Sequence, residues 1–180
     1  MFRKTKGVAG MIELLILHIL SQKSSTMYGI KKYIETVFSA FVSPSFGAIN
    51  PALKKLEKND CIKPGKLFSE GGKLSIYYTI TEKGKKELVN ILLEDMSQNP
   101  SQFFLLARLK LVLADYLSKD EKKRLFFIVK SLALKFKNQA KQVQNEGQFY
   151  YNIVLDNLAC EYTNIITVVE GLEKDNARNS

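Results

Sequence analysis

Apolar residues recur at helical spacing through the first sixty positions of the chain, where three helices are predicted. Residues 11–20 are apolar almost all round, a pattern typical of a helix that packs on several sides. The polar break at residues 24–26 can cap the next helix. That second helix is predicted by the apolar positions that fall on one of its faces: Ile30, Tyr33, Ile34, Val37, Phe38 and Phe41.

A third helix is predicted after a second polar break at residues 43–45. Ile49, Leu53 and Leu56 mark its buried side by their spacing, and Asn50, Lys54, Lys55 and Lys58 mark its exposed side. A proline in a helix interior costs about 3 kcal/mol. Either the regular helix begins at Asn50, which puts Pro51 in the first turn, or the helix is kinked. We favour the late start, with residues 45–49 as a tight entry.

The period of the pattern changes to two after the third helix. Apolar side chains at positions 74, 76, 78 and 80 alternate with more polar ones, which predicts a half-buried strand. The Gly71-Gly72 pair predicts a turn before this strand. Residues 61–69 are the expected partner strand, although Pro64 and Gly65 weaken its first part. A helix from Glu82 to about position 96 follows, capped by Thr81.

Everything after Asn99-Pro100 reads as helix. One helix is predicted over residues 103–117, and a longer one opens at the Ser118/Glu121 capping box and ends at Gly147, before a last helix. Their apolar faces exceed what one chain would easily bury, so we expect a homodimer. The predicted dimerisation residues are Phe103, Leu106, Leu125, Val129, Leu132, Phe136, Tyr150, Val154, Leu158, Tyr162, Ile165 and Val169.

The order of three helices, a hairpin and a helix within about 95 residues is that of a winged helix-turn-helix. The expected fold class is mainly α with a small β-hairpin. Residues 1–97 form an N-terminal winged helix-turn-helix DNA-binding domain, and residues 98–180 form a C-terminal helical dimerisation domain. In such modules the third helix enters the major groove. Winged helices that dock proteins, and architectural proteins that bind DNA without sequence preference, share this pattern and remain the alternative.

The distribution of charge favours double-stranded DNA as the partner. The 180 residues carry a net charge of +9, and residues 1–90 hold 15 Lys and Arg against 7 Asp and Glu. A basic half of this kind is typical of nucleic-acid binding. Lysines and the N-terminal arm are expected to contact phosphates, and short polar tips the base edges. The predicted DNA-binding residues are Arg3, Lys4, Lys6, Tyr28, Lys31, Lys32, Ser43, Ser45, Phe46, Ala48, Asn50, Lys54, Lys55, Lys66, Lys73 and Tyr77.

Three separated blocks of this sequence resemble the PadR family of transcriptional regulators. They are Met27-Tyr28-Gly29-Ile30, the segment from Ser43 to Glu57, and Gly71-Gly72-Lys73 with the run from Tyr77 to Gly84. The resemblance covers about residues 10–90, and the helical second half is similar to that of the larger PadR subgroup. It implies a bacterial-type dimeric repressor, sometimes an activator, that a small aromatic molecule can release.

Two positions depart from the family's pattern. The family usually has Tyr before the proline of the third helix, where this chain has Asn50, and often has His where this chain has Tyr28. Asparagine is a good bidentate partner for adenine. We therefore expect Asn50 to change the sequence preference rather than to abolish binding.

Other functions find little support in the sequence. No set of residues suggests a catalytic centre, so an enzyme is not expected, and neither a cofactor nor a metal site is predicted. Cys61 and Cys160 are too isolated to form a disulfide framework or a zinc site. Residues 11–20 are too short to span a bilayer, so no membrane partner is expected and the location is expected to be cytoplasmic. Eight aromatic residues of the second half either line a pocket for a small aromatic effector or simply pack in the core and the dimer: Phe103, Phe104, Phe126, Phe127, Phe136, Phe149, Tyr150 and Tyr151.

Overall fold

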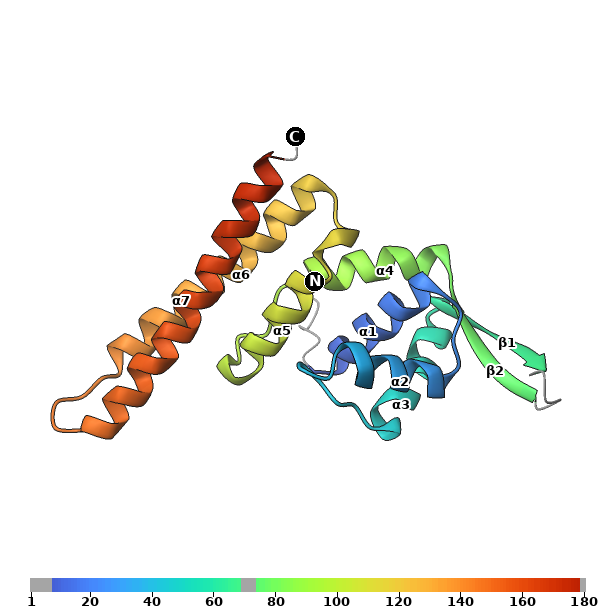
Figure 1. The fold of residues 1–180 in the computed structure, drawn as a ribbon, viewed down its shortest axis with the longest axis horizontal. Coiled ribbons are helices and arrows are strands. Elements are labelled where there is room, and N and C mark those ends of the chain that lie inside the picture. Colours follow the sequence, from blue (N-terminus) through green and yellow to red (C-terminus); the bar gives the residue numbers. More distant parts are fainter. Residues whose placement is uncertain (1–7, 69–73, 179–180) are drawn as a thin grey trace.

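The computed structural model describes residues 8–68 and 74–178, which form helices and one two-stranded sheet (Figure 1). Beyond these ranges lie Arg3, Lys4, Lys6 and Lys73 of the predicted DNA contacts. The elements, in chain order, are α1 (Val8–Gln22), α2 (Met27–Val37), α3 (Phe46–Lys58), β1 (Ile62–Phe68), β2 (Leu74–Ile80), α4 (Glu82–Leu93), α5 (Pro100–Val112), the 3-10 turn η1 (Ala114–Tyr116), α6 (Lys119–Gln142) and α7 (Phe149–Arg178).

The N-terminal half is a winged helix-turn-helix, as the sequence predicts. Helix α1 is buried from Gly10 to Leu17 and again at Ile19 and Leu20, and it packs against α2, α3 and α4. Thr26 and Thr81 cap α2 and α4, each through a side-chain oxygen that accepts a hydrogen bond at 3.0 Å from a backbone N–H three residues on. Strands β1 and β2 pair antiparallel, and Ser25 bridges to Tyr78 at the edge of the hairpin.

The prediction that α3 begins at Asn50 is wrong, because the helix begins at Phe46 and contains Pro51. Pro51 lies early in the helix, so its missing N–H leaves only the carbonyl of Gly47 without an intrahelical partner. Gly47 is exposed, and water can therefore bond to this carbonyl. The expected tight entry at residues 45–49 is thus the first turn of the helix, with Ser45 as the N-cap residue.

Other predicted boundaries also shift. Helix α2 ends at Val37, which is half exposed rather than buried. Helix α4 ends before Glu94, whose backbone is extended. The helix predicted over residues 103–117 is divided into α5, which begins at Pro100, and η1. Gly147 has a φ of 86° and lies in the connection to α7, after α6 has already ended.

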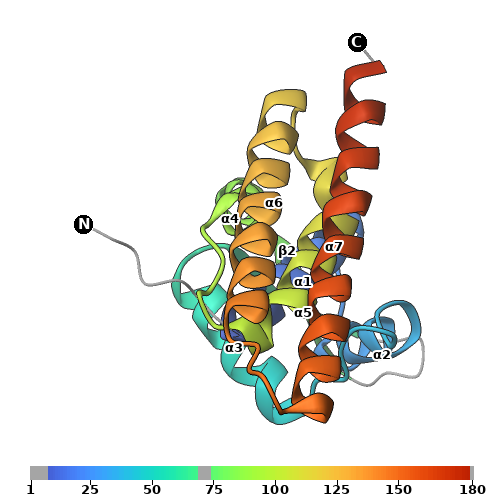
Figure 2. The same cartoon turned by 90° about the vertical axis from the view of Figure 1, so that its left-hand side faces the viewer.

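Helices α6 and α7 form a long antiparallel hairpin and lie side by side in both views (Figures 1 and 2). The predicted capping box at Ser118 and Glu121 is present at the start of α6. Helices α6 and α7 cover each other's apolar stripes, and α5 packs against α6. Most residues assigned to a dimer surface are therefore buried within one chain. The assignment is corrected for these nine: Phe103, Leu106, Leu125, Val129, Leu132, Phe136, Tyr162, Ile165 and Val169. Leu158 is half-buried, whereas Tyr150 and Val154 are exposed.

The apolar core runs through both halves of the chain. One cluster of buried side chains extends from Met11 on α1 to Val169 on α7, and it includes Phe103 of α5. The winged helix and the C-terminal helices therefore share packed surface. The division into two domains at residue 97 stays a prediction. None of the helices in the described part of the chain has the length and hydropathy needed to cross a bilayer.

Candidate nucleic-acid interface

The turn between α2 and α3 places the start of α3 at the surface of the N-terminal half (Figure 1). The backbone N–H groups of Phe41 and Val42 both bond to the carbonyl of Phe38, which tightens the turn after α2. Pro44 is buried, and Ser43, Ser45 and Phe46 around it are at least partly exposed. The predicted contacts Ser43 and Ser45 thus lie at the entrance to α3, where solvent can reach them.

Helix α3 has one buried side and one solvent-facing side. Ile49, Ala52, Leu53 and Leu56 are buried against the N-terminal core. At three- and four-residue spacing, a stripe on the opposite side carries Gly47, Pro51, Lys54 and Lys58. Asn50 and Ala48 are exposed on the two flanks of this stripe. Sequence reasoning placed Lys58 on the exposed face of the helix but did not include it among the predicted DNA contacts. Its spacing from Lys54, which puts both on one stripe, was the signal that could have found it.

Lys55 has a partner inside the protein. Its ammonium group forms an ion pair with the carboxylate of Glu13, which belongs to α1 and is only 2% exposed. A buried carboxylate is costly unless it is paired, so this bond attaches α3 to α1. The pair lies at a hollow of about 300 Å³ between the two helices, which is also lined by Ala48 and Pro51. Lys55 is therefore engaged within the fold, although its side chain is 46% exposed.

Lys31 is also engaged within the chain. It forms an ion pair with Glu35 one turn along α2, and its ammonium nitrogen lies 4.9 Å from the centroid of the Phe46 ring. Such a cation–π contact attaches the exposed side of α2 to the first residue of α3. Tyr28 and Lys32 on the same helix are exposed, the tyrosine by 67% of its surface.

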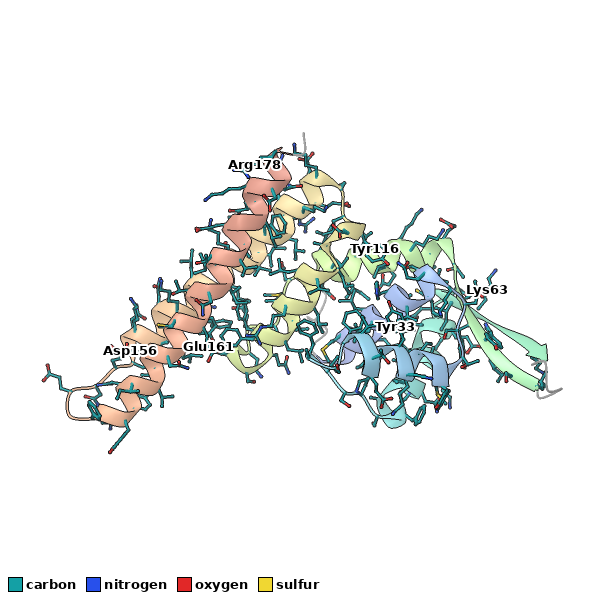
Figure 3. All side chains as sticks on the ribbon, in the orientation of Figure 1. Tyr33, Lys63, Tyr116, Asp156, Glu161 and Arg178 are labelled. Atoms are coloured by element: carbon teal, nitrogen blue, oxygen red, sulfur yellow. The ribbon has the colours of Figure 1, made fainter. Side chains whose placement is uncertain are left out.

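The wing presents two different faces. Side chains alternate along each strand, and the pairing of Lys63 with Thr79 and of Gly65 with Tyr77 puts Lys63 and Tyr77 on one face. Lys66 pairs with Ile76 on the other face. Lys63 is exposed at the wing (Figure 3) and was missed by sequence reasoning, because Pro64 and Gly65 weakened the prediction of this strand.

The apolar side of β2 is less buried than its alternation suggests. Tyr78 and Ile80 pack against the core at the root of the wing, and burial, together with the nearby Glu57, raises the pKa of the Tyr78 hydroxyl. Leu74 and Ile76 farther out are 48% and 50% exposed. The outer part of the wing therefore offers apolar as well as cationic surface to a partner.

The aromatic residues considered for an effector pocket are not gathered around one cavity. Phe103, Phe104, Phe136 and Tyr162 pack on one another with ring centroids between 4.7 and 5.7 Å apart, which is core packing. A cavity of about 420 Å³ between α5, η1, α6 and α7 has Phe126 as its one aromatic lining residue. Within the described ranges, no group of three acidic, histidine or cysteine side chains is placed to hold a metal ion.

The fold and this surface define the class of a winged-helix transcriptional regulator. Residues 16–90 match the model of the transcriptional regulator PadR-like family. No curated protein matches the chain. A PadR family transcription regulator from Clostridium difficile R20291 is 34% identical, with 43% of this chain and 78% of that chain covered and a TM-score of 0.38. A PadR-like transcriptional regulator from Bacillus cereus is 31% identical, with coverages of 47% and 80% and a TM-score of 0.41.

A third solved structure covers more of the chain at lower identity. It is Bacillus subtilis PadR in complex with operator DNA, which is 21% identical, with 92% of this chain and 99% of that chain covered and a TM-score of 0.44. The match of residues 16–90 to the family model carries the assignment. The chain belongs to the PadR-like family of transcriptional regulators.

Proposed function

We propose that this protein is a homodimeric repressor that binds a dyad-symmetric DNA site with α3 in the major groove and the wing on the adjacent backbone. The observation that carries the proposal is the exposed stripe of α3, on which Lys54 and Lys58 stand apart from the ion pairs that engage Lys31 and Lys55. A helix of this kind fits the major groove. Membership of a family of transcriptional regulators supports DNA as the partner.

The division of roles on α3 follows from these ion pairs. Lys54 and Lys58, with Lys63 and Lys66 of the wing, are exposed and are assigned to phosphates. Asn50 on the flank of the stripe is assigned to a base edge, because its amide has both a donor and an acceptor. Lys55 is assigned to the α1–α3 contact rather than to DNA, since moving it would leave Glu13 buried without this cation.

Dimerisation is proposed through the exposed start of α7. Phe149, Tyr150, Ile153 and Val154 lie within its first two turns and are between 50% and 83% exposed. Exposed apolar residues gathered in this way mark association surfaces. Two copies related by a two-fold axis would present two α3 helices about 34 Å apart, one turn of DNA. A cytoplasmic location is proposed from the isolated cysteines, and release by a small aromatic molecule is proposed from the family resemblance.

The DNA assignment is tested with a duplex selected by the purified protein from a random-sequence library. Fluorescence anisotropy measures its affinity at several salt concentrations between about 50 and 200 mM. Each phosphate contact contributes about 0.9 to the slope of log affinity against log salt. We expect Lys54→Ala to lower the slope by about this amount. Lys141→Ala, which removes an exposed lysine at the far end of α6, is the matched control and should leave it unchanged.

Three outcomes contradict parts of the proposal. Equal affinity for the selected duplex and a scrambled one would favour an architectural protein. Absence of binding to any duplex would favour a protein-docking winged helix. An unchanged salt slope in Lys54→Ala would remove α3 from the phosphate contacts.

The dimer is tested separately by sedimentation equilibrium. Val154→Glu introduces a charge on the exposed start of α7 and should shift the protein towards monomer. Asn164→Glu adds the same charge at an exposed position farther along α7 and serves as the control. A monomeric unaltered protein, or a Val154→Glu variant that still dimerises, would contradict this assignment.

A further inference from the structure

The hydroxyl group of Tyr116 is bonded to three side chains of the last turn of α1. It lies 3.0 Å from Nδ1 of His18, 2.8 Å from Oγ of Ser21 and 2.5 Å from Nε2 of Gln22. Tyr116 ends η1 in the C-terminal half, about a hundred residues away in sequence, and Figure 3 shows it where the C-terminal helices meet the N-terminal half. One oxygen atom therefore connects the two halves of the chain.

The hydrogen atoms available fix the direction of each bond. The Ser21 hydroxyl donates its only hydrogen to the carbonyl of His18 at 2.6 Å, so its oxygen accepts the hydrogen of the Tyr116 hydroxyl. The Tyr116 oxygen then accepts from the amide of Gln22 and from Nδ1–H of His18. The neutral His18 ring thus carries its hydrogen on Nδ1. All three contacts of the Tyr116 hydroxyl group are then hydrogen bonds, and replacing any one of the four side chains removes at least one of them.

Aromatic packing supports the same contact. The His18 ring meets the rings of Tyr116 and Phe38 edge-on, with centroids 5.6 and 5.5 Å away, and lies 6.2 Å from Tyr33 of α2. Burial lowers the pKa of His18 below 6.5, so the ring is neutral at pH 7. The cluster of His18, Ser21, Gln22 and Tyr116, which we call the Tyr116 joint, is therefore packed as well as hydrogen-bonded.

The Tyr116 joint acts on the helix that carries α3. Helix α1 packs against α3, and the Glu13–Lys55 ion pair holds the two together. The orientation of α1 relative to the C-terminal helices consequently determines where the exposed stripe of α3 points. In a dimer whose two subunits meet through their C-terminal helices, a rotation at this joint changes the distance between the two α3 helices.

We propose that Tyr116 is a positioning residue that sets the angle between the winged helix and the C-terminal helices, and so the spacing of the two DNA-reading helices. This inference rests on the proposed function for its DNA part. Its structural part, the connection through one hydroxyl group, stands independently. Tyr116 acts only through α1 and is assigned no contact with DNA.

Tyr116→Phe is the informative change, because it keeps the ring and removes only the hydroxyl group. Tyr150→Phe makes the same change at an 83% exposed ring on α7 and is the matched control. A hydrogen-bonded network of this kind is expected to protect the end of α1 by about tenfold in hydrogen exchange. The amide of Lys23, which bonds to the carbonyl of Ile19 at 3.2 Å, reports on this turn.

The first measurement is hydrogen exchange followed by mass spectrometry on the full-length protein. We expect exchange about tenfold faster at residues 18–24 in Tyr116→Phe and no change in Tyr150→Phe. A Ser21→Ala variant should show a similar increase in exchange rate. The double variant Ser21→Ala/Tyr116→Phe should exchange no faster than Tyr116→Phe alone. Unchanged exchange in Tyr116→Phe, or additive effects of the two substitutions in the double variant, would contradict the proposed role of the Tyr116 joint.

The second measurement separates positioning from simple destabilisation. The selected duplex is compared with one that keeps a single half-site. Tyr116→Phe should lower the affinity for the two-half-site duplex by about tenfold and leave the single half-site within about twofold. Equal losses on both duplexes would show a merely structural role and overturn the positioning. If the unaltered protein binds no duplex, the proposed function fails along with the DNA part of this inference. The exchange experiment still tests whether the Tyr116 hydroxyl group holds the end of α1 in place.

Discussion

Lys110 is the most deeply buried cation in the described part of the chain. It is 5% exposed on α5, and its ammonium group donates a hydrogen bond at 2.5 Å to the carbonyl of Glu94 after α4. Burial lowers the pKa of Lys110 from 10.5 to about 8, although the nearby Glu94 and Asp95 raise it. The folded protein therefore holds this proton less tightly than the unfolded chain does.

The size of this effect follows from the two pKa values. A decrease from 10.5 to about 8 means that the charged side chain costs the folded state about 3 kcal/mol relative to the unfolded state. Between pH 8 and 10.5 the unfolded chain keeps a proton that the folded chain has released, so the free energy of unfolding rises with pH in this window. From pH 7 to pH 9 the contribution of Lys110 rises by about 1 kcal/mol.

The test compares the unaltered protein with Lys110→Met, which keeps an unbranched apolar side chain without the charge. Urea unfolding is followed by circular dichroism at pH 7 and pH 9, at one protein concentration. The difference in unfolding free energy between the two proteins cancels the other titrating groups. Between pH 7 and pH 9, we expect the unfolding free energy of the unaltered protein to rise by about 1 kcal/mol relative to that of the variant. A difference that does not change with pH would refute the reasoning.

Three further predictions concern the winged helix and the start of α6. Gly84→Ala is expected to destabilise the fold by about 1–3 kcal/mol, measured by urea unfolding, because a Cβ would overlap the Cys61 carbonyl and lie 2.7 Å from Cγ1 of Ile80; a stability equal to that of the unaltered protein would contradict the packing at the root of the wing. Ser118→Ala is expected to cost about 1 kcal/mol in the same assay, since it removes the capping box of α6, and Ser131→Ala, at an exposed position inside α6, is its control. Asn50→Ala is expected to change which base is preferred at one position of each half-site, as read by selection and sequencing; an unchanged preference would rule out a base contact by Asn50.

The sequence predicts the winged helix well because each of its elements has a local signal. Thr26 and Thr81 cap their helices as expected, and the alternation around Ile76 and Tyr78 marks a real strand. Local rules fail at Pro51, because the cost of a proline depends on whether the exposed carbonyl of Gly47 can reach water. The general cost of a proline in a helix interior takes no account of that exposure.

The contacts between elements could not be predicted from periodicity. The apolar stripe at Val129 and Val169 reads the same whether it faces a second copy or the neighbouring helix of one hairpin, and the structure shows the second. The ion pair between Glu13 and Lys55 joins residues 42 positions apart, and the bonds of Tyr116 join residues more than 90 apart. A lysine on an exposed helix face therefore resembles a DNA contact until its partner is known.

Two copies of α3 are proposed to read the two halves of a symmetric DNA site, and this arrangement underlies the other functional assignments. Sequencing the duplexes that the purified protein selects from a random library tests it most directly. We expect an enriched inverted repeat whose half-sites are centred about 10 base pairs apart, one turn of the double helix. Selection of a single unrepeated motif would contradict the dimeric arrangement, and no enrichment at all would contradict sequence-specific binding.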